Sequence, residues 1–237
     1  MILAIESSGK TASVAVLDEE VVVCESAQST GFFHSQTLMV LVQNMLTVAG
    51  IELEQLSLVA VSCGPGSFTG LRIGVSAARG LAAGLGINCA GVSTLRGLAA
   101  NLQGLPVFAC ALIDARNDFF YCGLFNMELN QQIGSDEVVS FEALKLKLQA
   151  LKTGGKPIFL VGDGAKQCYL RLKEQESGLN LRLACEQLRL ARAVGVALCA
   201  RSDLQNSCLN VNFELNYLRQ SQAQRLLIEK QQKGRLL

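Results

Sequence analysis

Histidine is nearly absent from this sequence of 237 residues, and that scarcity limits the chemistry available to the protein. His34 is the single instance. Zinc sites that need two histidines, including the HExxH type, are therefore excluded. A Ser-His-Asp triad would have to use His34, which begins a predicted amphipathic helix with no nucleophile-elbow serine nearby. We expect no catalytic residues and no metal ligands of this kind.

Charged side chains are scarce as well. They make up 17% of the residues, against about 25% in typical globular proteins, while 50% of the residues are hydrophobic. This composition excludes disorder for the body of the chain. The most apolar stretch, residues 71–92, contains Arg72 and Arg79, so no run of about 18 uncharged apolar residues predicts a membrane span. A net charge of +1 argues against a nucleic-acid binder acting alone, and we expect the surplus apolar surface to contact a partner protein.

Cysteine pairs with the spacing of metal ligands or redox motifs are also missing. The nine cysteines are scattered, with no CxxC pair among them. The N-terminus has no positively charged region of the kind that begins a signal peptide. We therefore expect a cytoplasmic protein with nine free thiols and no intrachain disulfide, because the cytosol is reducing. The cysteines lie at positions 24, 63, 89, 110, 122, 168, 185, 199 and 208.

The sequence does contain one order of predicted elements, three strands followed by helix, strand and helix, that occurs twice. In the first half we expect strands at 3–5, 12–17, 21–24, 58–62 and 87–90, and helices at 34–49, 70–85 and 95–102. In the second half we expect strands at 107–113, 117–124, 133–139 and 158–161, and helices at 141–151, 165–176 and 187–201. Residues 1–103 and 104–218 are thus predicted to form two lobes of an α/β protein, followed by a basic tail at 219–237.

Two such lobes, each with a mixed sheet and flanking helices, face one another in the actin-like (ASKHA) duplicated RNase H-like fold of actin, Hsp70 and sugar kinases. In that fold nucleotide phosphates lie between carboxylates on the first strands of the two lobes, here Glu6 and Asp114. These residues or Asp163 could hold Mg²⁺ through oxygens together with a nucleotide, which would make the chain a kinase or ATPase. The alternative is that each serves only as a turn or cap residue, and no nucleotide site is assigned.

Two glycine-containing segments imitate phosphate-binding motifs without meeting their requirements. Residues 8–11 (SGKT) match the end of a P-loop, but the loop needs a glycine where this chain has Ala4. Residues 64–70 (GPGSFTG) have neither the spacing of GxGxxG nor that of GxSxG, so Ser67 is not a predicted nucleophile. We interpret the first segment as a turn and the second as a loop.

A row of small side chains marks the predicted helix at 70–85. Gly70, Gly74, Ala78 and Ala82 are spaced four apart and form a smooth ridge on one side. Each glycine inside a helix costs about 1 kcal/mol relative to alanine, so the close approach of another backbone is the expected compensation. The approaching element is either this chain's own sheet or a second subunit. Gly74→Leu distinguishes the two, because it would unfold the protein in the first case and only block association in the second.

Several segments together resemble the TsaB (YeaZ) family. The most specific is GPGSFTGLRIGVS at 64–76, and other parts of the family pattern are similar to ILAIESS at 2–8 and HSQ at 34–36. Later landmarks are similar at 91–95 (GVSTL), 114–116 (DAR), 162–165 (GDGA) and 217–219 (YLR). The resemblance runs from Ile2 to about Arg219. One departure is Glu6, where the family commonly has aspartate, and no phosphate or metal role is carried over to it.

The resemblance implies an actin-like fold and a catalytically silent paralogue of the TsaD subunit, with no cofactor of its own. TsaB-type proteins pair with TsaD and, in bacteria, with the TsaE ATPase, and they homodimerise when TsaD is absent. The assembly transfers a threonylcarbamoyl group from threonylcarbamoyl-AMP to the adenosine next to the anticodon, in tRNAs that read codons starting with A. This chain would contact tRNA only indirectly.

The resemblance also implies a partner interface on the helices of the first lobe. The residues expected to form it are His34, Leu38, Leu41, Met45, Gly70, Gly74, Ala78 and Ala82. The basic tail is expected either to fray into solvent or to reach tRNA phosphates. Its cationic residues are Arg219, Arg225, Lys230, Lys233 and Arg235.

Overall fold

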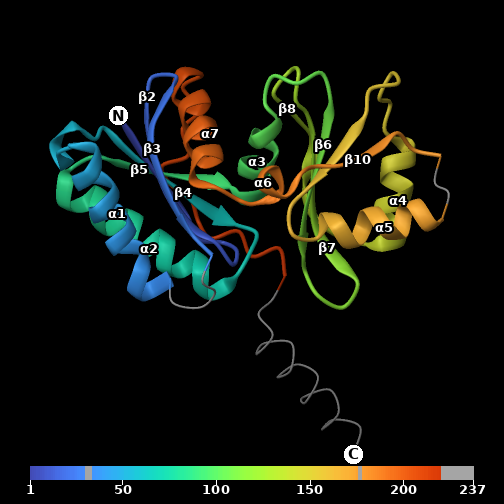
Figure 1. Cartoon of the computed structure of the whole chain (residues 1–237), viewed down its shortest axis with the longest axis horizontal. Helices are drawn as coiled ribbons and strands as arrows, with labels where there is room; N and C mark the ends of the chain where they lie inside the picture. The colour runs from blue at the N-terminus through green and yellow to red at the C-terminus, as the bar shows by residue number, and fades with distance from the viewer. Residues whose placement is uncertain (30–33, 176–177, 220–237) are drawn as a thin grey trace, which may run out of the picture.

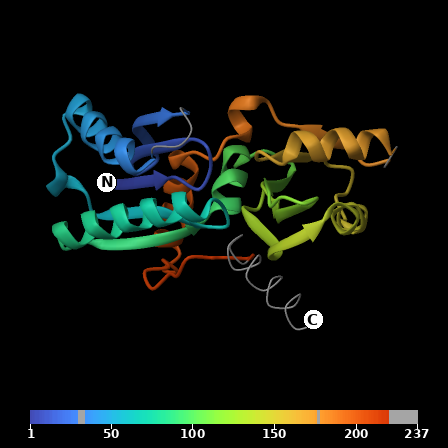
Figure 2. The same cartoon turned by 90° about the horizontal axis from the view of Figure 1, so that it is seen from below.

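The computed structural model describes residues 1–29, 34–175 and 178–219, which build two five-stranded mixed sheets side by side (Figure 1, and from below in Figure 2). In each sheet three antiparallel strands come first in the chain, and two later strands extend the sheet in parallel. The expected duplicated α/β architecture is confirmed. The basic tail beyond Arg219 lies outside the described residues.

The first sheet has the strand order β3-β2-β1-β4-β5. Its antiparallel part consists of β1 (Ile2–Glu6), β2 (Ala12–Asp18) and β3 (Val21–Gln28), and its parallel part adds β4 (Leu58–Gly64) and β5 (Asn88–Ser93). All five residues of β1 and all seven of β4 are buried, as is typical of strands covered on both faces. The continuous apolar runs at these two places in the sequence reflect that central position.

The second sheet repeats this plan in the order β10-β9-β6-β7-β8. It consists of the antiparallel strands β6 (Phe108–Asp114), β7 (Phe119–Asn126) and β8 (Gln131–Ser140) and the parallel strands β9 (Ile158–Val161) and β10 (Leu181–Leu183). The sequence does not predict β10, because a strand of three residues shows no clear period. The other four strands lie where the sequence predicts them.

Helices cover both faces of each sheet (Figure 1). The outer faces are covered by α1 (His34–Ala49) and α2 (Phe68–Leu85) on the first sheet, and by α4 (Phe141–Ala150) and α5 (Ala165–Glu174) on the second. The inner faces are covered by α3 (Thr94–Ala99) and α7 (Ala193–Gln205). Two short 3-10 helices, η1 (Leu53–Gln55) and η2 (Ala100–Leu102), lie in the connections. None of the helices in the described part of the chain combines the length and apolar character needed to cross a bilayer.

The two inner helices are exchanged between the lobes. α3 follows the first sheet in sequence, but Leu95 and Leu98 pack against the second sheet. α7 comes from the second half of the chain, but Val196 and Ala200 lie in the core of the first sheet. The boundary expected after residue 103 therefore does not separate the packed units, since α7 belongs with the first sheet.

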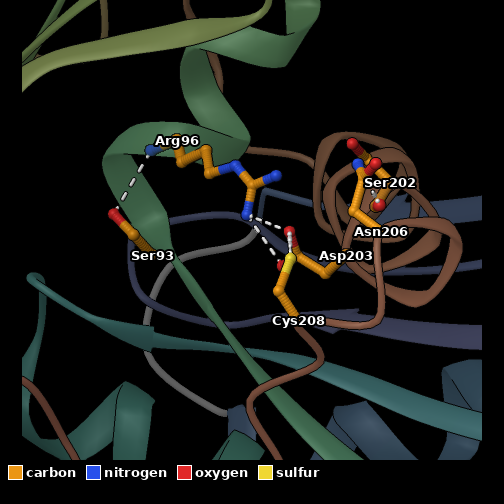
Figure 3. A network of polar contacts seen from close by, with 6 residues as sticks. All are labelled: Ser93, Arg96, Ser202, Asp203, Asn206 and Cys208. Carbon is orange, nitrogen blue, oxygen red and sulfur yellow. Dashed lines mark hydrogen bonds and ion pairs between the residues drawn. The ribbon is translucent and has the colours of Figure 1, made fainter.

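An ion pair and a close backbone contact join α3 to α7. The guanidinium of Arg96 on α3 lies 2.7 Å from the carboxylate of Asp203 on α7, and Ser93 caps the start of α3 (Figure 3). A Cβ placed on Gly195 of α7 would lie 2.1 Å from the carbonyl oxygen of Gly97 on α3. The two helix backbones thus touch where they cross.

The helix expected at 187–201 is interrupted in the structure. A short α6 (Glu186–Arg189) comes first, then an extended segment, then α7. Arg192 is extended, at φ −134° and ψ 149°, and its guanidinium pairs with Glu25. The N–H of Ala193 donates to the Ser13 hydroxyl at 2.8 Å. These contacts with the first sheet fix the chain where it passes from one lobe to the other, and α7 begins only there.

Candidate functional site

Glu6 closes β1 as the sequence predicts, but its carboxylate lies inside the first lobe. The side chain is 1% exposed and accepts a hydrogen bond from the backbone N–H of Ser8 at 2.5 Å. Removal from water raises the pKa of the Glu6 carboxyl above its ordinary value, and the hydrogen bonds from Ser8 only partly oppose this. In this conformation Glu6 offers no open position to a ligand between the lobes.

The turn after β1, which imitates the end of a P-loop, is covered by the chain itself. Ser67 N–H donates to the carbonyl oxygen of Ser8 at 2.7 Å, and His34 Nε2 lies 2.9 Å from the carbonyl oxygen of Gly9. A Cβ on Gly66 would lie 2.7 Å from the same Ser8 oxygen, so the loop before α2 packs directly against this turn. The turn therefore holds the loop and α1 in place.

Asp114 and Asp163 lie together in the second lobe, at the ends of β6 and β9. Asp163 accepts a hydrogen bond from the backbone N–H of Asp114 at 3.0 Å, and Asp114 accepts one from the backbone N–H of Arg116 at 2.8 Å. Burial raises the pKa of Asp163 above its ordinary value. Its hydrogen bonds with backbone N–H groups and the charge of Lys10 only partly oppose this. Both carboxylates thus act as turn acceptors. Within residues 1–29, 34–175 and 178–219, no group of three His, Cys, Asp or Glu side chains is arranged to hold a metal ion.

The ridge of small residues on α2 faces this chain's own sheet. A Cβ on Gly70 would lie 2.1 Å from the carbonyl oxygen of Ser7, and a Cβ on Gly74 would lie 2.1 Å from the Ser7 hydroxyl. Ala78 and Ala82 are 0% and 3% exposed in the same core. The expectation that these four residues meet a partner is corrected. Gly70 and Gly74 pack against Ser7, just after β1, and Ala78 and Ala82 are buried in the core of the first sheet.

The residues expected on α1 are also turned mostly inward. Leu38 and Met45 are 1% and 6% exposed and belong to the first core, so a partner cannot reach them in the folded protein. Leu41 is half-buried against that core. His34 is half-buried as well, contacts the turn after β1, and lines a shallow hollow between α1 and α2. The residues that the sequence predicts for the interface therefore lie mostly on the inner faces of α1 and α2, which pack against the first sheet.

The outer side of the same two helices is open and apolar. A hollow of about 410 Å³ is lined by Met39, Leu53, Ser76, Ala77, Gly80, Leu81, Gly84 and Leu85. Apart from the adjacent residues and nearby backbone of α2 itself, no described atom would lie within 4 Å of a Cβ placed on Gly80 or Gly84. On α1 the apolar side chain of Met39 lines this hollow and is 42% exposed. We call the surface around this hollow the α1/α2 face and define it by Met39, Ser76, Gly80 and Gly84.

The cysteines give a first testable prediction, about their order of reaction. Cys185 and Cys208 are exposed and are expected to react first with iodoacetamide in the native protein. Burial raises the pKa of Cys63 to about 11 and those of Cys168 and Cys199 to about 12, so these thiols stay protonated and slow. Mass spectrometry after brief alkylation checks the order.

The same labelling, repeated without reductant after unfolding, tests the expected absence of disulfides. All nine cysteines should then carry the label. A pair that stays unlabelled in denaturant would contradict the prediction of free thiols.

Two α/β lobes, each with a five-stranded mixed sheet and flanking helices, define a protein of the actin-like class. A hexokinase of the ROK type from Thermus thermophilus shares this fold, with a TM-score of 0.51 and 10% identity over 86% of this chain and 99% of that one. Residues 27–228 match the family model described as TsaD, tRNA N6-adenosine threonylcarbamoyltransferase. Together with the TsaB relatives described next, this match shows that the chain belongs to the TsaB (YeaZ) family.

Relatives and solved structures agree on this family. The tRNA threonylcarbamoyladenosine biosynthesis protein TsaB of Bacillus subtilis is 35% identical over 68% of this chain and 70% of its own length. The Escherichia coli TsaB is 34% identical over 54% of this chain and 56% of its own length. The structure of YeaZ from Pseudomonas aeruginosa superposes with a TM-score of 0.72 and 25% identity, covering 89% of this chain and 94% of that one. The family resemblance and the actin-like fold class are both confirmed.

Proposed function

We propose that this protein is a structural and activating subunit of the apparatus that makes threonylcarbamoyladenosine in tRNA. It acts by binding a TsaD-type catalytic subunit. The relatives named TsaB and the match to the TsaD model support its place in this pathway of tRNA modification. The observation that carries the binding role is the α1/α2 face, which lies on the outer side of the first lobe (Figure 1).

The α1/α2 face is unusual for a helical surface in water. α1 has no Asp, Glu, Lys or Arg among its 16 residues, and α2 has only Arg72 and Arg79 among its 18. The solvent-facing side of a surface helix normally carries charged and polar residues. This lack of charge favours burial of the surface against another protein.

Two exposed glycines add a second argument. Gly80 and Gly84 each cost α2 about 1 kcal/mol relative to alanine, and no other element in the described part of the chain packs against them. A partner helix lying directly over them would offset that cost through many close dispersion contacts. It would also bury Met39, which lines the same hollow. The face is therefore suited to close packing against a helical partner.

In this proposal the chain itself performs no chemistry. The kinase or ATPase alternative requires Glu6 and Asp114 to present oxygens to Mg²⁺ and a nucleotide. The burial of Glu6 and the use of Asp114 as a turn acceptor support the non-catalytic role. The purified chain with ATP and Mg²⁺ should show no turnover, and a rate above about 1 s⁻¹ would favour the enzyme alternative.

The proposal extends to the rest of the assembly. The TsaD-type subunit carries out the transfer of a threonylcarbamoyl group from threonylcarbamoyl-AMP to the adenosine next to the anticodon, in tRNAs that read codons starting with A. This chain contacts tRNA only indirectly. A TsaE-type ATPase joins the assembly, and without TsaD two copies of this chain pair through the same face. We place the assembly in the cytoplasm.

Two substitutions on the α1/α2 face test the binding role. Gly80→Leu and Met39→Asp should leave the monomer folded, because both positions are exposed. Leucine at 80 holds a partner backbone away, and aspartate at 39 would be buried without a partner charge. Each should weaken binding to the TsaD-type subunit of the same organism by at least about tenfold, measured by calorimetry or sedimentation.

The matched control for Met39→Asp is Leu146→Asp on α4. Leu146 is 67% exposed on the outer side of the second lobe and should tolerate the charge without loss of binding. Normal binding by both variants of the α1/α2 face would show that the interface lies elsewhere. A wild-type chain that does not bind the TsaD-type subunit would contradict the proposed function itself.

A further inference from the structure

After α7 the chain returns across the molecule as an extended segment, residues 209–219, which we call the strap (Figure 2). Its first part is anchored in the first lobe by Phe213, which is 3% exposed in the core. The ring lies against Gly91 of β5, where a Cβ would be 2.3 Å from Phe213 Cγ. Arg79 of α2 donates to the carbonyl oxygen of Phe213 at 2.6 Å, and its guanidinium lies 4.7 Å from the ring centroid. The start of the strap is thus fixed to β5 and α2.

The middle of the strap crosses the end of β4 and the start of α2. Asn216 N–H donates to the carbonyl oxygen of Cys63 at 2.7 Å, and a Cβ on Gly64 would lie 2.5 Å from the Asn216 carbonyl oxygen. Tyr217 stacks on Phe68 with 4.6 Å between ring centroids. Arg72 Nε donates to the Tyr217 hydroxyl at 3.1 Å. This part of the strap is therefore held by both backbone and side-chain contacts with the first lobe.

The far end of the strap reaches the second lobe through Arg219. Its guanidinium donates to the carbonyl oxygens of Ala115 and Arg116, the latter at 3.0 Å, in the turn between β6 and β7. The same guanidinium lies 4.6 Å from the ring centroid of Phe119, at the start of β7. A planar guanidinium that binds two carbonyls and stacks on a ring fixes the turn in more than one direction. The strap thus connects the two lobes along a path separate from the α3–α7 crossing.

We propose that the strap is a clasp that holds the turn between β6 and β7 against the first lobe. Phe213 fixes its start in the core of the first lobe, and Tyr217 supports its middle by stacking on Phe68. Arg219 binds the turn on the second lobe. Opening the lobes on this side requires the contacts of Arg219 to break, since the strap behind it is fixed to β4, β5 and α2. Arg72 also lines the hollow beside His34, so the clasp links the edge of the α1/α2 face to the second lobe. This role is independent of the proposed partner.

Hydrogen exchange followed by mass spectrometry tests the clasp in the full-length chain. In the wild type the turn is closed by Ala115 N–H to the Phe119 carbonyl at 2.9 Å and by Phe119 N–H to the Arg116 carbonyl at 3.2 Å. Arg219→Ala should speed exchange in residues 115–119 by about tenfold, because the charge-assisted bonds to the turn are lost. Exchange in β1 and β4 should stay within about twofold of the wild type.

Two further variants make the test specific. Arg182→Ala, at an exposed arginine of β10, makes the same chemical change on the second lobe and should leave the turn unchanged. Tyr217→Leu removes the intermediate support and should also speed exchange in residues 115–119. Unchanged exchange of the turn in Arg219→Ala would overturn the clasp. Equal loss of protection in both sheets would also overturn it, because the strap would then be a general part of the core.

Discussion

Gly74→Leu is expected to destabilise the folded protein strongly. A Cβ at this position would lie 2.1 Å from Ser7 Oγ and 3.6 Å from Val61 Cγ2, so a leucine side chain has no space between α2 and the sheet. The Ser7 hydroxyl cannot simply turn away, because it is fully buried and donates to the carbonyl oxygen of Gly70 at 2.9 Å. Overpacking together with an unpaired buried hydroxyl should cost about 3 kcal/mol or more, a large part of the stability of a typical domain.

The matched control is Gly80→Leu, six residues further along the same helix. Gly80 is exposed, and leucine is a better helix former than glycine by several tenths of a kcal/mol, so the melting temperature should hold or rise. Thermal melts followed by circular dichroism compare the two variants. A Gly74→Leu protein that melts like the wild type would show that α2 does not pack on β1 as described.

The reason why the sequence points to the wrong face of α2 is geometric. Two rows of small residues run along this helix, one through Gly74, Ala78 and Ala82 and the other through Ser76, Gly80 and Gly84. They are two residues apart, about 200° around the helix axis, and so lie on nearly opposite sides. A row of small side chains indicates that some neighbouring element packs closely against the helix, but it does not identify that element. Neither row contains a charge that would mark the solvent side.

The repeated order of elements predicts two lobes, but not the exchange of α3 and α7. Each half of the chain supplies its own sheet and its own outer helices, and their hydrophobic periods are visible in the sequence. Which sheet an inner helix covers depends instead on contacts between distant residues, such as Ser13 with Ala193 and Glu25 with Arg192. No local pattern carries that information.

The same limit applies to the carboxylates. The end of an apolar run places Glu6, Asp114 and Asp163 at the ends of strands, and the structure confirms those places. Whether a carboxylate faces solvent or the core is decided by segments far away in sequence. For the turn after Glu6 that segment is the loop before α2, whose Ser67 donates to Ser8. The strap, which has no regular period, is likewise recognisable only from its contacts.

Gly195→Ala is expected to be the second strongly destabilising change, although it adds only one methyl group. Its Cβ would lie 2.1 Å from the carbonyl oxygen of Gly97 and 3.0 Å from the Gly97 carbonyl carbon. Both are backbone atoms, so the clash is relieved only if α3 and α7 move apart. That movement would strain the Arg96–Asp203 ion pair and loosen the inner cores of both sheets (Figure 3). We expect a loss of about 2–3 kcal/mol in the free energy of unfolding, measured by urea denaturation.

The facing glycine provides the control, because the crossing is not symmetric. A Cβ on Gly97 would meet its nearest atoms at 3.6 to 3.8 Å, which is ordinary van der Waals contact. Gly97→Ala should therefore be neutral, or stabilise the protein by up to about 1 kcal/mol through the better helix propensity of alanine. The same methyl group is thus expected to have opposite effects on the two sides of one contact. Equal destabilisation by both substitutions would contradict the packing of α3 against α7, and with it the exchange of inner helices between the lobes.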